Sequence, residues 1–208
     1  MAEAFLRQGA LAHLGLKARA VAELGPAGVG LAAMPPQPQL ALRGEGDDPA
    51  FLQAAEVALE FALPLRPNTT ARGEAGTACW LGPSEWLLLV PGQAEPWIER
   101  LSAALAGVRH ALNDVSESRT QIRISGARAV DLLAKGTSLD LHPSVFPRGA
   151  CAQSTLALAD MLLHRPETEA APVFDVYAHR SFADYLWRWL EGAAAEYGVV
   201  VLAPAAIT

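Results

Sequence analysis

The chain has 208 residues, of which 51% are hydrophobic and 18% are charged, and its formal net charge is −6 at pH 7. This composition can fill a sizeable core, which excludes disorder over the whole chain. An acidic chain with no basic run longer than two residues repels a phosphate backbone, so nucleic acid is not expected as a partner.

Two cysteines, Cys79 and Cys151, are too few for a disulfide framework in a chain of this length, and free thiols suit a reducing cytosol. The N-terminal segment has scattered charges and no uninterrupted apolar stretch, so we do not interpret it as a signal peptide. The longest apolar runs, such as Trp86–Val90, have the length of a strand and are far too short to span a membrane. The sequence therefore predicts a cytoplasmic protein with no membrane segment.

Residues 1–39 show little periodicity and end in the proline-rich segment Met34–Gln39. Closely spaced prolines favour an extended backbone. We therefore expect an arm that lies over the body of the protein or over a partner, with a short helix near residues 4–14.

Alternating strand and helix patterns begin at residue 40. Residues 39–44 read as a strand, and residues 47–62 read as a helix that begins with an aspartate cap and a proline in the first turn. Two apolar runs within residues 78–91, joined by Gly82-Pro83-Ser84, indicate a hairpin. A helix over residues 94–106 and a strand over residues 109–115 complete this half.

The second half repeats this order. We expect a strand at 121–126, a helix at 127–136, paired apolar runs at 154–166, a strand at 173–178 and a helix at 180–198. In the last helix the buried stripe is predicted to contain Phe182, Leu186, Trp189 or Leu190, and Ala193. Trp187 and Trp189 point about 200° apart on this helix, so one of the two can be exposed at a partner surface.

The similar order of elements indicates a duplication. Leu63–Asn68, with the sequence LPLRPN, follows the first long helix, and Leu139–Ser144, with the sequence LDLHPS, follows the corresponding helix. The prediction is an α+β fold of two duplicated ferredoxin-like strand-helix-strand-strand-helix-strand units with mainly antiparallel sheets. The expected division is an arm at 1–39, a first repeat at 40–115 and a second repeat at 116–208, with the two repeats packed as one compact unit.

His142 and Cys151 are the residues that suggest nucleophilic catalysis. Such a pair needs the imidazole within hydrogen-bond reach of the sulfur and a third group that orients the ring. The alternative is that His142 lies in a turn and Cys151 is a small apolar residue at the start of a strand. We favour the second interpretation, because Arg66 takes the place of His142 in the first repeat and no cysteine has an equivalent place there.

Other catalytic and cofactor motifs are not recognisable, and we assign no catalytic, cofactor-binding or metal-binding residue. No two histidines have helical spacing and there is no C-x-x-C pair, so a metal site is not predicted. The glycines of residues 25–30 do not have the spacing of a dinucleotide-binding turn, and residues 43–49 do not have that of a phosphate loop. The five histidines are His13, His110, His142, His164 and His179.

Residues 113–200 resemble the aminomethyltransferase family of the glycine cleavage system, a folate-binding fold. The similarity includes Asp114-Val115-Ser116, Gly126, Leu132-Leu133, Asp140 and the segment Leu156–Arg165. In that family the first of two adjacent aspartates is tied to catalysis on folate. Here this position is Ala159, and only the second aspartate, Asp160, is present, which implies that folate chemistry is lost.

A larger part of the chain resembles the gamma-subunit family of bacterial heterotetrameric sarcosine oxidases. The most specific segment is Lys135–Gln153, with the pattern KG-x-x-LDLHP-x-x-F-P-x-G-x-CAQ. The resemblance implies a non-catalytic subunit, packed mainly on the alpha subunit, in a complex that also contains beta and delta subunits. In that family FAD, FMN, NAD, zinc and tetrahydrofolate are held by the other subunits.

Two alternatives remain open at this stage. The first is the equivalent subunit of a complex of the N-methylglutamate dehydrogenase type, since the substrate is selected by the flavin subunit. The second is a free-standing folate-binding protein, in which Asp160 would be the remaining acidic residue.

Overall fold

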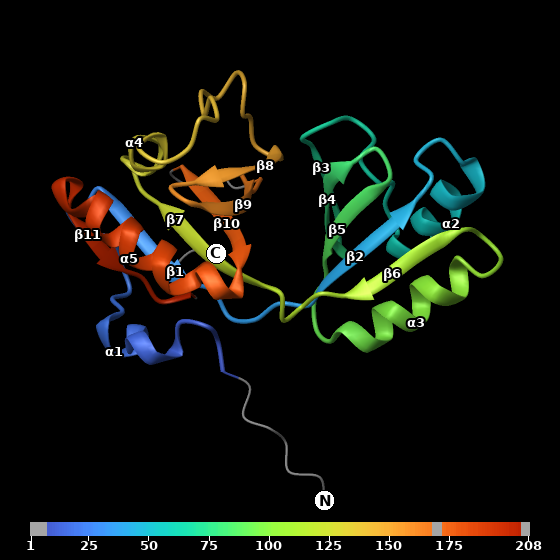
Figure 1. The fold of residues 1–208 in the computed structure, drawn as a ribbon, viewed down its shortest axis with the longest axis horizontal. Coiled ribbons are helices and arrows are strands. Elements are labelled where there is room, and N and C mark those ends of the chain that lie inside the picture. The colour runs from blue at the N-terminus through green and yellow to red at the C-terminus, as the bar shows by residue number, and fades with distance from the viewer. Residues whose placement is uncertain (1–7, 168–171, 205–208) are drawn as a thin grey trace, which may run out of the picture.

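The computed structural model describes residues 8–167 and 172–204, which form two β-sheets with helices on the sides that face away from each other (Figure 1). The strand order is β3-β4-β5-β2-β6 in the first sheet and β11-β1-β7-β10-β9-β8 in the second. Apart from β1 with β11, the strand pairs are antiparallel. The predicted α+β class with mainly antiparallel sheets is therefore confirmed.

The first half follows the sequence pattern closely. Its elements are β2 (Gln39–Gly44), α2 (Pro49–Leu59), β3 (Thr70–Gly73), β4 (Gly76–Gly82), β5 (Glu85–Leu89), α3 (Ala94–Ala104) and β6 (His110–Asp114). Helix α2 begins where it does because Oδ1 of Asp48 accepts a hydrogen bond from the Ala50 backbone N–H at 2.9 Å. It ends at Glu60, whose φ of 63° is left-handed. Strand β3 was not expected.

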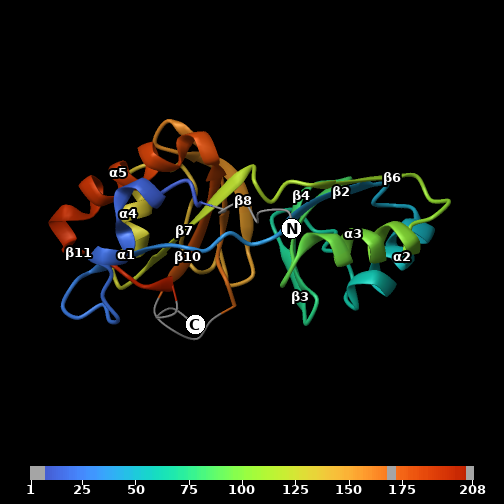
Figure 2. The same ribbon diagram turned by 90° about the horizontal axis from the view of Figure 1, so that it is seen from below.

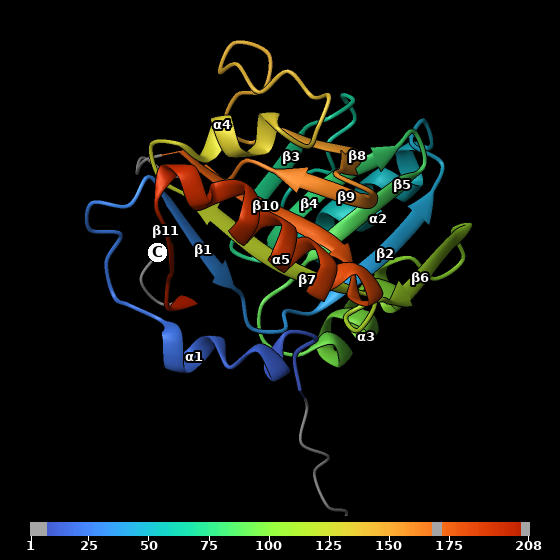
Figure 3. The same ribbon diagram turned by 60° about the vertical axis from the view of Figure 1, so that its left-hand side comes forward.

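The second half has the same order of elements. They are β7 (Arg119–Ser125), α4 (Ala129–Ala134), β8 (Cys151–Leu156), β9 (Ala159–His164), β10 (Val173–His179), α5 (Ala183–Ala194) and β11 (Val199–Val201). Helix α5 lies across the second sheet (Figure 3). It buries Ala183, Leu186, Trp187, Leu190 and Ala194. The predicted stripe is therefore right at Leu186 and Leu190 but one position out of place at both ends, and Trp187 is buried while Trp189 is only partly buried. Phe182 is 39% exposed.

The expected arm contains a central strand. Strand β1 (Val29–Ala33) lies between β11 and β7 in the second sheet, and both Val29 and Leu31 are fully buried. The prediction of a surface arm is therefore wrong for this segment, because its amide and carbonyl groups complete the ladders of two neighbouring strands. The proline-rich residues 34–38 connect this strand to β2 in the first sheet (Figure 2).

Strand β1 also explains how the two repeats differ. In the first sheet β6 lies beside β2, whereas in the second sheet β1 occupies the equivalent place beside β7. The last strand of the second repeat, β11, therefore pairs in parallel with β1 at the edge of the sheet.

The segment before β1 contains two short helical turns. They are η1 (Ala12–Leu14) and α1 (Leu16–Arg19), and Leu11 and Leu16 are buried against the core of the second half. The helix predicted near residues 4–14 agrees only in part with η1, and residues 4–7 lie outside the described part of the chain.

Three apolar cores stabilise the molecule. One packs α2 and α3 on the first sheet and a larger one packs α4 and α5 on the second. A small third core lies where the inner faces of the sheets meet, and it consists of Cys79, Leu87, Leu89, Cys151, Leu162 and Tyr177. The two repeats are joined through this third core, so neither inner sheet face is fully exposed to water.

Candidate functional site

His142 and Cys151 do not form a catalytic pair. The Nδ1 atom of His142, on the exposed loop before β8, lies 2.7 Å from Oγ of Ser144. Cys151 is fully buried, and its thiol donates to the backbone oxygens of Thr69 at 3.3 Å and Trp80 at 3.6 Å. Within residues 8–167 and 172–204 no hydrogen bond joins His142 to Cys151, so the geometry supports a packing role for the cysteine.

The two cysteines are neighbours in the third core. The hydrogen bond with Cys151 and complete burial raise the pKa of the Cys79 thiol. Neither side chain reaches the surface. The same hydrogen bond lowers the pKa of Cys151, with burial opposing this effect, so it is burial away from solvent and not a raised pKa that keeps this second thiol unreactive.

A polar cleft lies on the inner face of the second sheet. The strand registers place Arg119 on β7 opposite His179 on β10, and Asp160 on β9 opposite Thr155 on β8. His179 and Asp160 each follow directly on the last β10–β9 pair, Ala178 with Met161, so the four residues form one row. The row lines a cavity of about 530 Å³ whose walls come from β7, β8, β9 and β10. Burial lowers the pKa of Arg119, although the negative charge of Glu85 opposes this effect.

The residue tied to catalysis in the transferase family has an unexpected orientation here. Side chains alternate between the two faces of a strand. Ala159 is fully buried in the core below α4 and α5, whereas Asp160 is exposed and lines the polar cleft. A carboxylate at position 159 would have no access to a ligand in this cleft.

Deeper in the same sheet face is a buried charged group. Nε and Nη2 of Arg123 donate to the two carboxylate oxygens of Asp175 at 2.7 and 2.9 Å. Nδ1 of His164 lies 4.0 Å from Asp175. Burial lowers the pKa of His164 to about 4, against the opposing effect of the Asp175 charge. The Arg123 side chain is 18% exposed and that of Asp175 2%, so the cluster is largely buried, and its geometry is that of a structural ion pair.

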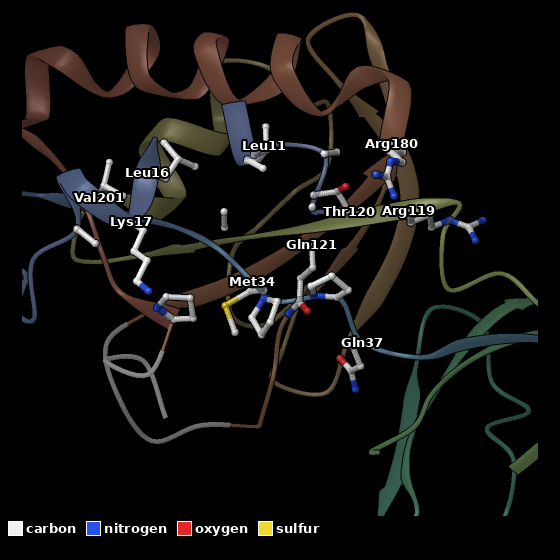
Figure 4. Close-up of a pocket in the computed structure, with 18 of the residues that line it drawn as sticks. Leu11, Leu16, Lys17, Met34, Gln37, Arg119, Thr120, Gln121, Arg180 and Val201 are labelled. Atoms are coloured by element: carbon white, nitrogen blue, oxygen red, sulfur yellow. The ribbon is translucent and has the colours of Figure 1, made fainter. Parts of the chain in front are cut away.

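A cavity of about 800 Å³ lies under the N-terminal segment (Figure 4). Leu11 and Leu16 of that segment lie on one side of the cavity with Met34 on the other, and Lys17 extends into it from α1. Sequence reasoning missed this cavity because its walls come from five separate parts of the chain. Its apolar lining suits apolar groups rather than catalysis of a polar reaction.

No three histidine, cysteine, aspartate or glutamate side chains in residues 8–167 and 172–204 are grouped as metal ligands. In the same ranges, every helix is too short or too polar to cross a bilayer.

The fold defines the class of protein to which this chain is similar. Aminomethyltransferase T of the glycine cleavage system from Bartonella henselae superposes with a TM-score of 0.69, covering 95% of this chain and 59% of that chain at 17% identity. This likeness shows that the chain has the aminomethyltransferase-like fold.

The family is defined more closely by sequence. Residues 43–196 match the model of the sarcosine oxidase gamma subunit family, and the chain belongs to that family. A sarcosine oxidase subunit gamma from Corynebacterium sp. strain P-1 is 32% identical over 160 residues, which is 76% of each chain. The subunit from Corynebacterium sp. strain U-96 is 28% identical over 199 residues, which is 95% of each chain.

A solved structure supports the same assignment. A chain of the heterotetrameric sarcosine oxidase from Corynebacterium sp. U-96 superposes with a TM-score of 0.81 at 27% identity. The match covers 92% of this chain and 96% of that chain. The predicted resemblance to the gamma-subunit family is therefore confirmed.

Proposed function

We propose that this chain is the non-catalytic gamma subunit of a heterotetrameric sarcosine oxidase. Such a complex oxidatively demethylates sarcosine to glycine and produces hydrogen peroxide, and the methyl carbon leaves as formaldehyde or as methylene-tetrahydrofolate. The observation that carries the proposal is the family match over residues 43–196, together with a structural relative from a heterotetrameric enzyme that is covered almost completely.

The FAD, FMN, NAD, zinc and tetrahydrofolate of the complex are assigned to the other subunits. For folate, the residues of this chain do not fit the pattern of the transferase family, because Ala159 replaces the first aspartate and faces an apolar core. The buried cysteines and the largely buried Arg123–Asp175 pair also support a structural role. In this proposal the chain supports assembly of the complex by binding other subunits and carries no catalytic group.

The main contact of the chain in this proposal is the alpha subunit, with beta and delta subunits completing the complex in the cytoplasm. The buried free thiols are consistent with a reducing compartment.

Co-expression tests the proposal. The other three subunits are produced with and without this chain, and the yield of the flavin-containing complex, its thermal midpoint and its sarcosine-dependent peroxide production are compared. Omission is expected to reduce yield or thermal midpoint. Equal yield, stability and activity in both preparations would rule out a role in assembly.

Folate binding by the isolated chain is a second candidate function, and the specific observation in its favour is the cleft that holds Asp160 with Arg119 and His179. Titration of the isolated chain with tetrahydrofolate decides this point. Saturable binding that Asp160→Asn abolishes would support it, and no binding would exclude it.

A further inference from the structure

The two crossover loops of the repeats meet at one surface. The loop over residues 63–69 follows α2, and the loop over residues 135–150 follows α4 and rises above β8 (Figure 1). The backbone N–H of Cys151 donates to the oxygen of Asn68 at 3.0 Å, and that of Thr70 donates to the oxygen of Gly149 at 2.9 Å. Segments that are equivalent in the duplication thus form one continuous patch.

This patch exposes two apolar side chains, of which Val145 lines a cavity. Leu65 is 52% exposed and Val145 is 60% exposed. A cavity of about 340 Å³ lies between the loops, lined by Arg66 and Val145 among others. Large apolar side chains that gather at a depression are typical of an interaction site, whereas single exposed ones are common anywhere on a surface.

The long loop holds its shape without a partner. The oxygen of His142 accepts hydrogen bonds from the N–H groups of Val145 and Phe146, at 2.9 and 2.8 Å. The Phe146 ring is buried, and its backbone oxygen accepts from Nη1 of Arg165 at 2.6 Å. Because the loop is already ordered, docking there costs little conformational entropy.

The charge of the patch differs from that of the whole chain. The chain carries a net charge of −6, but Arg66, Arg148 and Arg165 gather at this surface. Burial and the nearby charge of Arg148 both lower the pKa of Arg165. Two carboxylates also lie at this surface. Asp140 accepts a hydrogen bond from the backbone N–H of His142, and Glu167 lies next to Gly149. In the described part of the chain neither Arg66 nor Arg148 has an ion-pair partner.

We propose that the two crossover loops form the docking surface for another subunit of the complex, which inserts an apolar side chain into the cavity and places carboxylates against Arg66 and Arg148. A second copy of this acidic chain is a poorer occupant, since two such chains repel each other. The inference rests on the proposed function, because it requires that the chain assembles with other subunits.

The test uses the full chain co-expressed with the other three subunits, one of which is tagged. Val145→Ser and the charge reversals Arg66→Glu and Arg148→Glu are compared with the unchanged chain by the amount of gamma chain retained at rising salt concentration. Each variant is expected to weaken retention about tenfold, and the charge reversals are expected to abolish its salt dependence.

Matched controls are available elsewhere on the surface. Val57, 66% exposed on the outer side of α2, provides Val57→Ser, and the exposed Arg109 provides Arg109→Glu. Both controls are expected to be retained like the unchanged chain. Thermal unfolding of each isolated variant shows that it is folded.

The outcomes separate the two proposals. If the unchanged chain is retained and the loop variants are retained equally well, the docking surface is wrong and the subunit role stands. If the unchanged chain is not retained at all, the subunit role itself fails. Self-association of the isolated chain in sedimentation that Val145→Ser abolishes would assign the surface to a second copy and overturn the inference.

Discussion

Arg123 and Asp175 face each other directly on the neighbouring strands β7 and β10 and are joined by two hydrogen bonds of 2.7 and 2.9 Å. Asp175 is 2% exposed, so its charge is almost completely removed from water. A buried carboxylate is tolerated when it is paired and hydrogen-bonded in this way.

Removal of this carboxylate is expected to be costly. Asp175→Ala leaves the half-buried guanidinium of Arg123 without its main acceptor, which should lower the free energy of unfolding by about 3–5 kcal/mol. The surface pair Arg100–Glu60 provides the control, and Glu60→Ala should cost less than about 1 kcal/mol. Urea denaturation of the isolated chains measures both values, and similar losses in the two variants would contradict the prediction.

The stability of the chain should fall in mild acid because of His164. Burial lowers the pKa of this imidazole from 6.5 to about 4 in the folded chain. Between these values the unfolded chain binds a proton that the folded chain does not, so stability decreases as the pH falls from about 6.5 to 4. The shift corresponds to a loss of up to about 3 kcal/mol over this range.

The variant His164→Leu should remove this part of the pH dependence. Nδ1 of His164 has no hydrogen-bond partner, so an apolar replacement leaves no acceptor or donor newly unpaired. Denaturation at several pH values compares the two slopes. An unchanged slope in the variant would show that another group is responsible.

Neither thiol should react in the folded chain. Cys79 and Cys151 are both buried, and the pKa of Cys79 is raised by its hydrogen bond with Cys151 and by burial. A thiol-reactive dye should label the native chain slowly and the urea-unfolded chain fully, with Cys79→Ala and Cys151→Ala identifying each site. Rapid labelling of native Cys151 would revive the hypothesis of a catalytic nucleophile.

Strand β1 should be essential for folding even though its segment has little sequence pattern. Leu31 is fully buried between β11 and β7, so Leu31→Ala should lower the free energy of unfolding by about 2–5 kcal/mol. Val57→Ala, at a position 66% exposed, is the control and should have little effect. Equal stability of the two variants would show that this segment lies over the surface as an arm.

Local sequence features determined much of each repeat. The predicted strand at 39–44 agrees with β2, and the predicted helix at 47–62 contains α2, because an aspartate cap and an apolar face act within the segment. The most specific segment of the family, Lys135–Gln153, also identified the family without any structure. These features act within one short segment, so they can be recognised without knowing which distant residues pack against it.

Pairing between distant segments decided the rest. Residues 29–33 form a strand only because β7 and β11 supply ladders on both sides, and a five-residue segment cannot reveal this. In the same way, the covering of one sheet face by α4 and α5 sets Ala159 in the core and Asp160 in the cleft. The meeting of the two crossover loops likewise depends on how the two repeats pack, because the residues that touch there are more than 70 positions apart in the chain.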